Sequence, residues 1–236
     1  INQFAEMSTN ILAKIVDHKK IEVAERKTQM SIAQLEAMPL YHQVGHSLKL
    51  NLLNADLTGI IAEFKRQSPS KGVINDIASV ADVANAYTQF GAAGISVLTD
   101  KTFFGGTLDD LSIAVKNPIP VLRKEFIIDE FQLIEAKAYG ASVILLIAAC
   151  LSPDTTHALA KFAKSLGLEV LEGYGMTESS GVISFNTQTD NKVGTVGPAL
   201  PGAQIRITRE GEIQYKAGNV FQGYWKNPEK TAETFT

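Results

Sequence analysis

The chain has 236 residues, of which 45% are hydrophobic and 20% are charged. This is the composition of a globular protein and not of a disordered one. A net charge of −3 provides no basis for binding nucleic acid or an anionic membrane, and the single cysteine, Cys150, excludes an internal disulfide. We therefore expect a cytoplasmic protein with one large domain or two modest ones.

A long amphipathic helix is predicted near the N-terminus, over residues 10–38. Its apolar positions recur at the 3.6-residue spacing of a helix, and Lys and Glu crowd the opposite face. The stripe comprises Ile11, Leu12, Ile15, Val16, Lys19 and Val23.

The connector over residues 39–54 is expected to be irregular. His42 and His46 have the i, i+4 spacing of a metal-binding pair on a helix. Gly45 weakens a helix there and no third ligand is apparent, so no metal site is predicted.

From residue 58 a strand–helix alternation begins, and each strand is apolar on both faces, which is typical of parallel βαβ units. Four such units and a fifth strand make about half of a (βα)8 barrel, which needs about 200 residues or more. The pattern alone fits a doubly wound sheet equally well. The expected strands are residues 60–65, 95–98, 120–123, 143–147 and 168–171; the expected helices are capped by Ser79, Asp129 and Ser152 or span residues 108–116.

The sequence changes character after Gly173, where Gly, Thr, Ser and Asn dominate. Ile205 and Ile207, then Ile213 and Tyr215, alternate with polar residues on either side of a Glu-Gly turn. This pattern predicts a β-hairpin, followed by a short helix over residues 228–235. We expect two domains, residues 1–170 and 171–236, the second of them small and mainly β.

The first candidate site lies in the segment IIAEFKRQSPSKG at residues 60–72. Glu63 and Lys65 are two apart on a predicted strand, so they point to the same face. The carboxyl end of a parallel strand is where barrel enzymes hold their catalytic residues. A structural Lys–Glu pair at a strand end is the alternative interpretation.

The segments IIAEFKRQSPSKGVI, ISVLTDKTFFGG and PVLRKEFIIDEFQ resemble indole-3-glycerol-phosphate synthase, a carbon–carbon lyase that performs the decarboxylating ring closure of tryptophan biosynthesis. The resemblance covers about residues 11–170 and implies half of a TIM barrel with an extra N-terminal helix over its mouth. It implies a small phosphorylated, anthranilate-derived substrate and no cofactor. In this family Lys65 would contact the substrate anions, Lys124 would be the general acid and Glu63 its acidic partner. The implied substrate-binding residues are Ser68 on the phosphate side, the aromatic walls Phe103 and Phe126, and the apolar Leu145.

One departure from that family concerns catalysis. The family's fifth strand ends in a catalytic glutamate, and by register this position falls on Gly173, while Glu172 lies one residue early. A shift of one residue turns a side chain to the other face, so Glu172 is expected to face the helix layer. The later strands, which carry the remaining catalytic residues and the phosphate site, have no counterpart. We therefore expect no synthase activity.

The segment EGYGMTESSG and the residues after it resemble a different family, the adenylate-forming acyl-CoA ligases (AMP-binding), over about residues 168–236. That resemblance implies Tyr174 near adenine, Thr177 on the AMP phosphate and Glu178 on Mg²⁺, a vestigial ATP and Mg²⁺ site. The upstream phosphate loop, the ribose-binding Asp and the C-terminal Lys of the family are missing. A plain turn after a strand explains G-Y-G equally well, and no adenylation is expected.

The two resemblances together indicate a chimera, and three alternatives remain: an inactive lyase hybrid, an acyl-CoA ligase fragment, and a designed or recombined hybrid without activity. A half barrel has two open sheet edges, which favour self-association.

Overall fold

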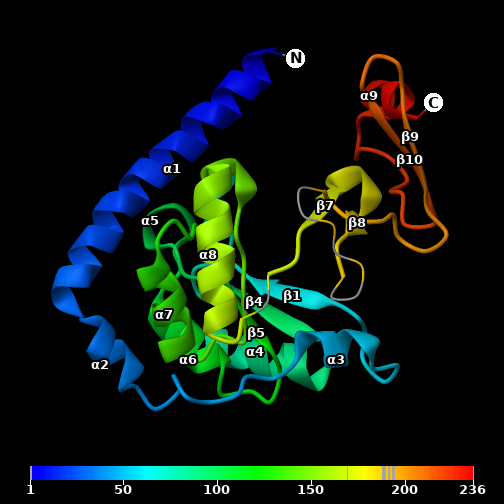
Figure 1. Cartoon of the computed structure of the whole chain (residues 1–236). Coiled ribbons are helices and arrows are strands. Elements are labelled where there is room, and N and C mark those ends of the chain that lie inside the picture. Colours follow the sequence, from blue (N-terminus) through cyan, green and yellow to red (C-terminus); the bar gives the residue numbers. More distant parts are fainter. Residues whose placement is uncertain (1, 169, 188–189, 191, 193–194, 236) are drawn as a thin grey trace. The chain divides into compact units, whose positions relative to one another are not determined.

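The computed structural model describes residues 2–168, 170–187, 190, 192 and 195–235. It divides into two compact units, Ile1–Val170 and Leu171–Thr236, which are shown in Figure 1. Among the described residues, no helix is long and apolar enough to cross a membrane.

The N-terminal segment forms two helices where one was predicted, α1 (Asn2–Gln29) and α2 (Ile32–Glu36). The helical conformation is interrupted at Ser31, which is extended and caps α2 in a reciprocal capping box with Gln34. A serine that can cap a new helix competes with continuing the old one, so the prediction of one helix was wrong here. The connector, predicted as irregular, contains the short helix α3 (Leu48–Leu53).

The first unit is built on a parallel sheet, as predicted, with the strand order β1-β4-β5-β6. All three strand pairs are parallel, and Figure 1 shows helices packed along them. The strands are β1 (Ile61–Phe64), β4 (Gly94–Leu98), β5 (Val121–Lys124) and β6 (Val143–Ile144); the helices between and after them are α4 (Val80–Gln89), α5 (Lys101–Phe104), α6 (Leu108–Ala114), α7 (Glu130–Ala138) and α8 (Pro153–Ser165).

The core of this unit lies between the sheet and its helices. Phe64, Ile95, Val97 and Val121 point from the strands into one buried cluster. Burying such a side chain is worth about 1.5–3 kcal/mol. The opposite face of the same strands carries Glu63 and its partners, so strand alternation places the candidate site and the core on opposite faces.

The end of the sheet differs from the prediction. β6 has only two residues, and Leu168, Val170 and Leu171 lie in no strand, while residue 169 is outside the described residues. Leu168 packs into the cluster around Leu159 of α8, and the next strand of the chain, Gly173–Met176, pairs with the segment Gly181–Phe185. The prediction of a fifth parallel strand was therefore wrong for Leu168, Val170 and Leu171.

The second unit consists of two antiparallel pairs and a helix. The predicted hairpin is confirmed, with Ile205 opposite Tyr215 and Ile207 opposite Ile213, and Gly211 in its turn has a φ of 85°. The other pair was not predicted because its strands are Gly-rich and short. The elements of the second unit are β7 (Gly173–Met176), the 3-10 turn η2 (Thr177–Ser179), β8 (Gly181–Phe185), β9 (Gln204–Ile207), β10 (Ile213–Lys216) and α9 (Pro228–Thr234).

Candidate active site at the carboxyl end of the parallel sheet

Glu63 is the centre of a charged group contributed by three strands. The Nζ of Lys65 lies 3.0 Å from Glu63 Oε1, and the Nζ of Lys124 lies 2.6 Å from Glu63 Oε2. Ser96, which pairs with Glu63 across β1 and β4, donates a hydrogen bond to Oε2 at 3.4 Å. The structure thus brings together the three residues to which the sequence analysis assigned catalytic roles.

The charges of this group fix its protonation. Burial raises the pKa of Glu63, but hydrogen bonds from Lys124 and Lys65 outweigh burial and hold the pKa below its usual range. Glu63 is therefore a carboxylate at neutral pH and cannot donate a proton. The side chains of Lys124 and Lys65 are 39% and 33% exposed, so both ammonium groups reach solvent. Two cations on one carboxylate leave one positive charge that can receive an anion.

The loop after β1 carries Ser68, in the short strand β2 (Gln67–Ser68) that pairs with β3 (Gly72–Val73). Ser68 Oγ accepts the backbone N–H of Lys71 at 3.2 Å. Arg66 holds the start of this loop through two hydrogen bonds to Asp110, at 2.6 and 2.8 Å. The serine hydroxyl is half-buried and can still donate to a ligand.

The predicted pocket walls lie on three further segments. Phe103 is on α5, with its ring edge-on to His18 at 5.6 Å. Phe126 is buried after β5, with its ring 5.8 Å from that of Phe104. Leu145 lies just after β6 and is half-buried. Across the described residues, hydrogen bonds and ion pairs link only Glu63, Lys65 and Lys124 among the seven site residues predicted for this unit.

A buried charge network beside this group was missed. Lys19, Asp100, Arg123, Glu125 and Glu135 are all at most 4% exposed. The sequence carried one signal, a lysine at position 19 inside the apolar stripe of the first helix.

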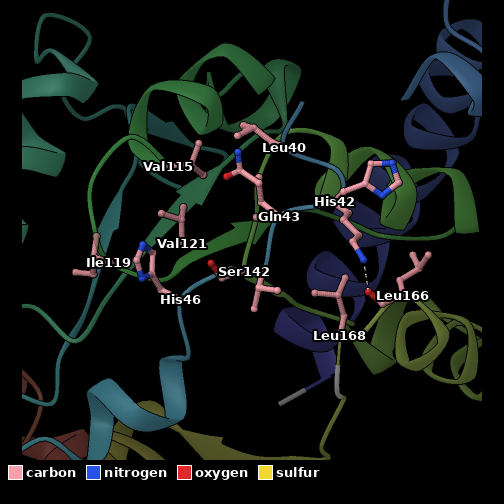
Figure 2. A pocket seen from close by; sticks show the side chains of 16 residues that line it. Leu40, His42, Gln43, His46, Val115, Ile119, Val121, Ser142, Leu166 and Leu168 are labelled. Carbon is pink, nitrogen blue, oxygen red and sulfur yellow. Dashed lines mark hydrogen bonds between the residues drawn. The ribbon is translucent and has the colours of Figure 1, made fainter. Parts of the chain in front are cut away.

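A cavity of about 330 Å³ lies at the other end of the sheet. Figure 2 shows His42 and His46 among the side chains around it, beside Ser142 and Val121. It is bounded by the starts of β5 and β6 and by the ends of helices. Within the described ranges no group of three His, Cys, Asp or Glu side chains is placed to hold a metal. In βα proteins this end serves stability more than chemistry.

The second unit holds the residues predicted for a nucleotide. Tyr174 lies on β7, and Thr177 is exposed in η2. Glu178 accepts a hydrogen bond from the hydroxyl of Tyr224, which lowers the pKa of the Glu178 carboxyl. That carboxylate is therefore already engaged by a protein donor.

Glu172 is not placed as the sequence analysis expected. It is exposed, it lies in no strand, and its carbonyl accepts the N–H of Asn186 at 2.8 Å. The prediction that strand register turns it toward the helix layer was wrong, because the strand on which it relied is not formed by the described residues 168, 170 and 171.

Fold and site together define an α/β protein with an acid–base group at the carboxyl ends of parallel strands. The family model described as indole-3-glycerol phosphate synthase matches residues 12–179. A protein of that name from Bacteroides thetaiotaomicron is 45% identical over 165 residues, covering 69% of this chain and 62% of the relative. One from Nocardioides sp. is 34% identical over 229 residues, covering 86% of this chain and 84% of the relative. The chain belongs to the indole-3-glycerol phosphate synthase family, whose members have the TIM-barrel fold.

The extent of these matches can be compared with the boundary expected at residue 170 between the two resemblances. The chain spans 62% of the length of the Bacteroides relative and 45% of a relative from Exiguobacterium sp.. The family match and the Nocardioides match both run past residue 170. A solved structure of O-succinylbenzoate coenzyme A synthetase from Bacillus subtilis in complex with AMP is 21% identical and covers 69% of this chain and 37% of that chain at a TM-score of 0.34, a likeness too weak to carry an inference.

Proposed function

We propose that the first unit binds the anionic substrate of an indole-3-glycerol phosphate synthase and that this chain does not complete the ring closure. The observation that carries the proposal is the Glu63 carboxylate with the ammonium groups of Lys65 and Lys124 on its two oxygens. Such a group retains one net positive charge at the exposed strand ends, where a phosphorylated carboxylate substrate needs cations.

Each residue has a role in this proposal. Lys124 donates a proton to the carbonyl oxygen that is lost as water, and Lys65 contacts the substrate anions. Glu63 keeps both lysines charged and oriented. Ser68 donates to the phosphate, while Phe103, Phe126 and Leu145 enclose the aromatic ring of the substrate, and no cofactor takes part.

In this proposal the chain cannot catalyse ring closure because it lacks the general base of the family. The family's catalytic glutamate falls on Gly173, which has no side chain, and Glu172 is exposed outside any strand. Loss of a general base costs about 10²–10⁴ in rate.

A turnover assay tests the proposal. The purified chain is incubated with the family's natural substrate, and indole fluorescence is followed. We expect no more product from the chain than from its Lys124→Met variant. Turnover by the chain that this substitution abolishes would contradict the inactivity.

Calorimetric titration with the same substrate tests binding separately. Lys65→Met removes a charge-assisted contact worth about 1.5–3 kcal/mol, so we expect the Kd to rise about tenfold or more. Lys216→Met, an exposed lysine on β10, is the matched control and is expected to leave the Kd unchanged. Equal affinity in the chain and in Lys65→Met would remove the support for this site.

We further propose that the second unit derives from an adenylate-forming ligase, which makes the chain a chimera, and that it forms no acyl-adenylate. The support is the segment EGYGMTESSG together with the missing phosphate loop. The Glu178 carboxylate would also have to leave Tyr224 before it could bind Mg²⁺. ATP–pyrophosphate exchange with a panel of carboxylic acids is expected to stay at the blank, and exchange above it would contradict this proposal.

A further inference from the structure

Lys19 is a fully buried lysine on helix α1, which carries most of its other charges toward solvent. Its side chain is 0% exposed, and it lies between Ile15 and Val23 on the apolar stripe of α1, each of which is 4% exposed. A lysine is almost never fully buried unless it is paired. Its partners are therefore what permits a charge on the buried face of α1.

The Nζ of Lys19 touches three carboxylates. It lies 2.8 Å from Asp100 Oδ2, 3.1 Å from Glu125 Oε1 and 2.7 Å from Glu22 Oε2. Burial lowers the pKa of Lys19, but Glu125 and Asp100 outweigh burial and raise it above its usual value. The ammonium is thus charged at neutral pH.

Asp100 and Glu125 are not ordinary partners, because each lies just beyond the end of a strand. Asp100 follows β4 and caps α5, where its Oδ1 accepts the N–H of Phe103 at 2.7 Å and of Phe104 at 3.3 Å. Glu125 follows β5, where its Oε1 accepts the N–H of Phe126 at 2.8 Å. One ammonium from α1 therefore joins the two loops that leave neighbouring strands.

A second tie holds α1 seven residues further along, on the same face of the helix. Arg26 contacts Glu135 of α7, and Arg123 Nη2 lies 2.8 Å from the same Glu135 Oε2. Arg123 in turn lies 3.7 Å from Glu125 Oε2. The network therefore returns to the carboxylate that Lys19 holds.

We propose that Lys19 is a positioning residue, through which helix α1 fixes the segments after β4 and β5 that carry Phe103 and Phe126. Lys124, the last residue of β5, directly precedes the held Glu125. What these loops bind rests on the proposed function. The coupling of α1 to the loops does not, since it follows from the distances and burial of Lys19, Asp100 and Glu125.

Native-state amide exchange of the unaltered chain, without ligand, gives the first test. The N–H groups of Phe103, Phe104 and Phe126 are bonded to the two carboxylates that Lys19 holds. We expect them to open together with the α1 amides around Lys19, with the same dependence on low concentrations of denaturant. The proposal would be overturned if the exchange of these three amides depended on denaturant concentration differently from the exchange of the α1 amides.

Two variants give the second test. Lys19→Met keeps the apolar stem and removes the charge, and we expect the three amides to exchange about tenfold or more faster than the β4 amides after correction for global stability. Lys20→Met is the matched control, because Lys20 is 63% exposed and forms its ion pair with Asp17, which is also exposed.

A purely structural role for Lys19 would accelerate all amides of the first unit equally, and that result would overturn the proposal. If Lys19→Met does not fold, the exchange of the unaltered chain still decides. Because no ligand is added, a chain that binds nothing can still confirm the coupling. Failure of the proposed function is therefore distinguishable from failure of this inference.

Discussion

Glu63 has two lysine partners because strand geometry brings them there. Lys65 directly follows the end of β1, with its Nζ beside Glu63 Oε1, and Lys124 ends a strand two places away in the sheet. Both ammonium groups are one-third or more exposed, so the ion pairs are worth about 1 kcal/mol or less each. Their larger effect is to keep one carboxylate ionised and two cations in place.

Glu63→Gln tests this at different pH values. The pKa of Glu63 in the folded chain is below its usual value, so its contribution is present above the unfolded pKa and is lost as pH falls through the folded pKa. We expect the variant to be about 1 kcal/mol less stable at pH 7 and the difference to vanish at low pH.

Urea unfolding at pH 7 and at acid pH measures the difference. Glu25→Gln, on the exposed face of α1, is the control. A difference that persists unchanged into acid would show that packing, and not charge, stabilises Glu63.

Sequence reasoning found Glu63 and Lys65 by their spacing, and it found Lys124 through resemblance. It missed the charge network of Lys19 because a lysine is usually at the surface. Its carboxylate partners, Asp100 and Glu125, are 81 and 106 residues away in the chain, and no local pattern records such a contact.

Helix starts were the best-predicted feature at the scale of elements. Ser79, Asp129 and Ser152 each cap the helix predicted for them, because capping is a local interaction between a side chain and the next turn. The break at Ser31 uses the same interaction, but the apolar pattern that continues past it hid the signal.

Ser152→Ala should destabilise α8, since Ser152 Oγ accepts the N–H of Thr155 at 3.1 Å. We expect a loss of about 1 kcal/mol in the free energy of unfolding. Ser165→Ala, in the last turn of the same helix, is the control. Equal stability of the two variants in thermal unfolding would show that this cap contributes nothing.

Strands were predicted less well than helices where their length depends on pairing with a neighbouring strand. Residues 143–147 are apolar enough for a longer strand, yet only Val143 and Ile144 pair with β5. A strand needs a neighbour as well as a suitable sequence. After α8 the N–H of Leu168 donates to the carbonyl of Ala163, and the next strand, β7, pairs with β8.

For the whole molecule, the sheet of the first unit has β1 at one edge and β6 at the other. Open edges favour pairing with another chain, and we propose that the protein self-associates through them. Ile61 on β1 is 40% exposed, and Ile61→Lys places a charge on that edge. Light scattering is expected to give a mass above that of the monomer for the chain and a lower mass for this variant.

Ile21→Lys is the matched control, because Ile21 is 60% exposed on α1 and away from the sheet edge. It is expected to leave the scattering mass unchanged. A clean monomer for the unaltered chain would contradict self-association.

The parallel α/β class could be predicted from the strand–helix alternation, and the second unit from its change of composition and its hairpin. Closure of a barrel could not, because closure depends on pairing between distant strands. Whether the group of Glu63, Lys65 and Lys124 is completed also depends on strand pairing. A fifth parallel strand would extend the sheet toward the catalytic arrangement of the family.

Amide hydrogen exchange across Val143–Gly181 tests most directly whether the parallel sheet ends at β6. We predict that the amides of Ile144 are protected and that those of Val170 and Leu171 are not, with protection returning in β7. Protection of Val170 and Leu171 as strong as that of Ile144 would show a fifth strand docked on the fourth. That result would contradict a parallel sheet that ends at β6 and would make synthase activity in this chain worth seeking again.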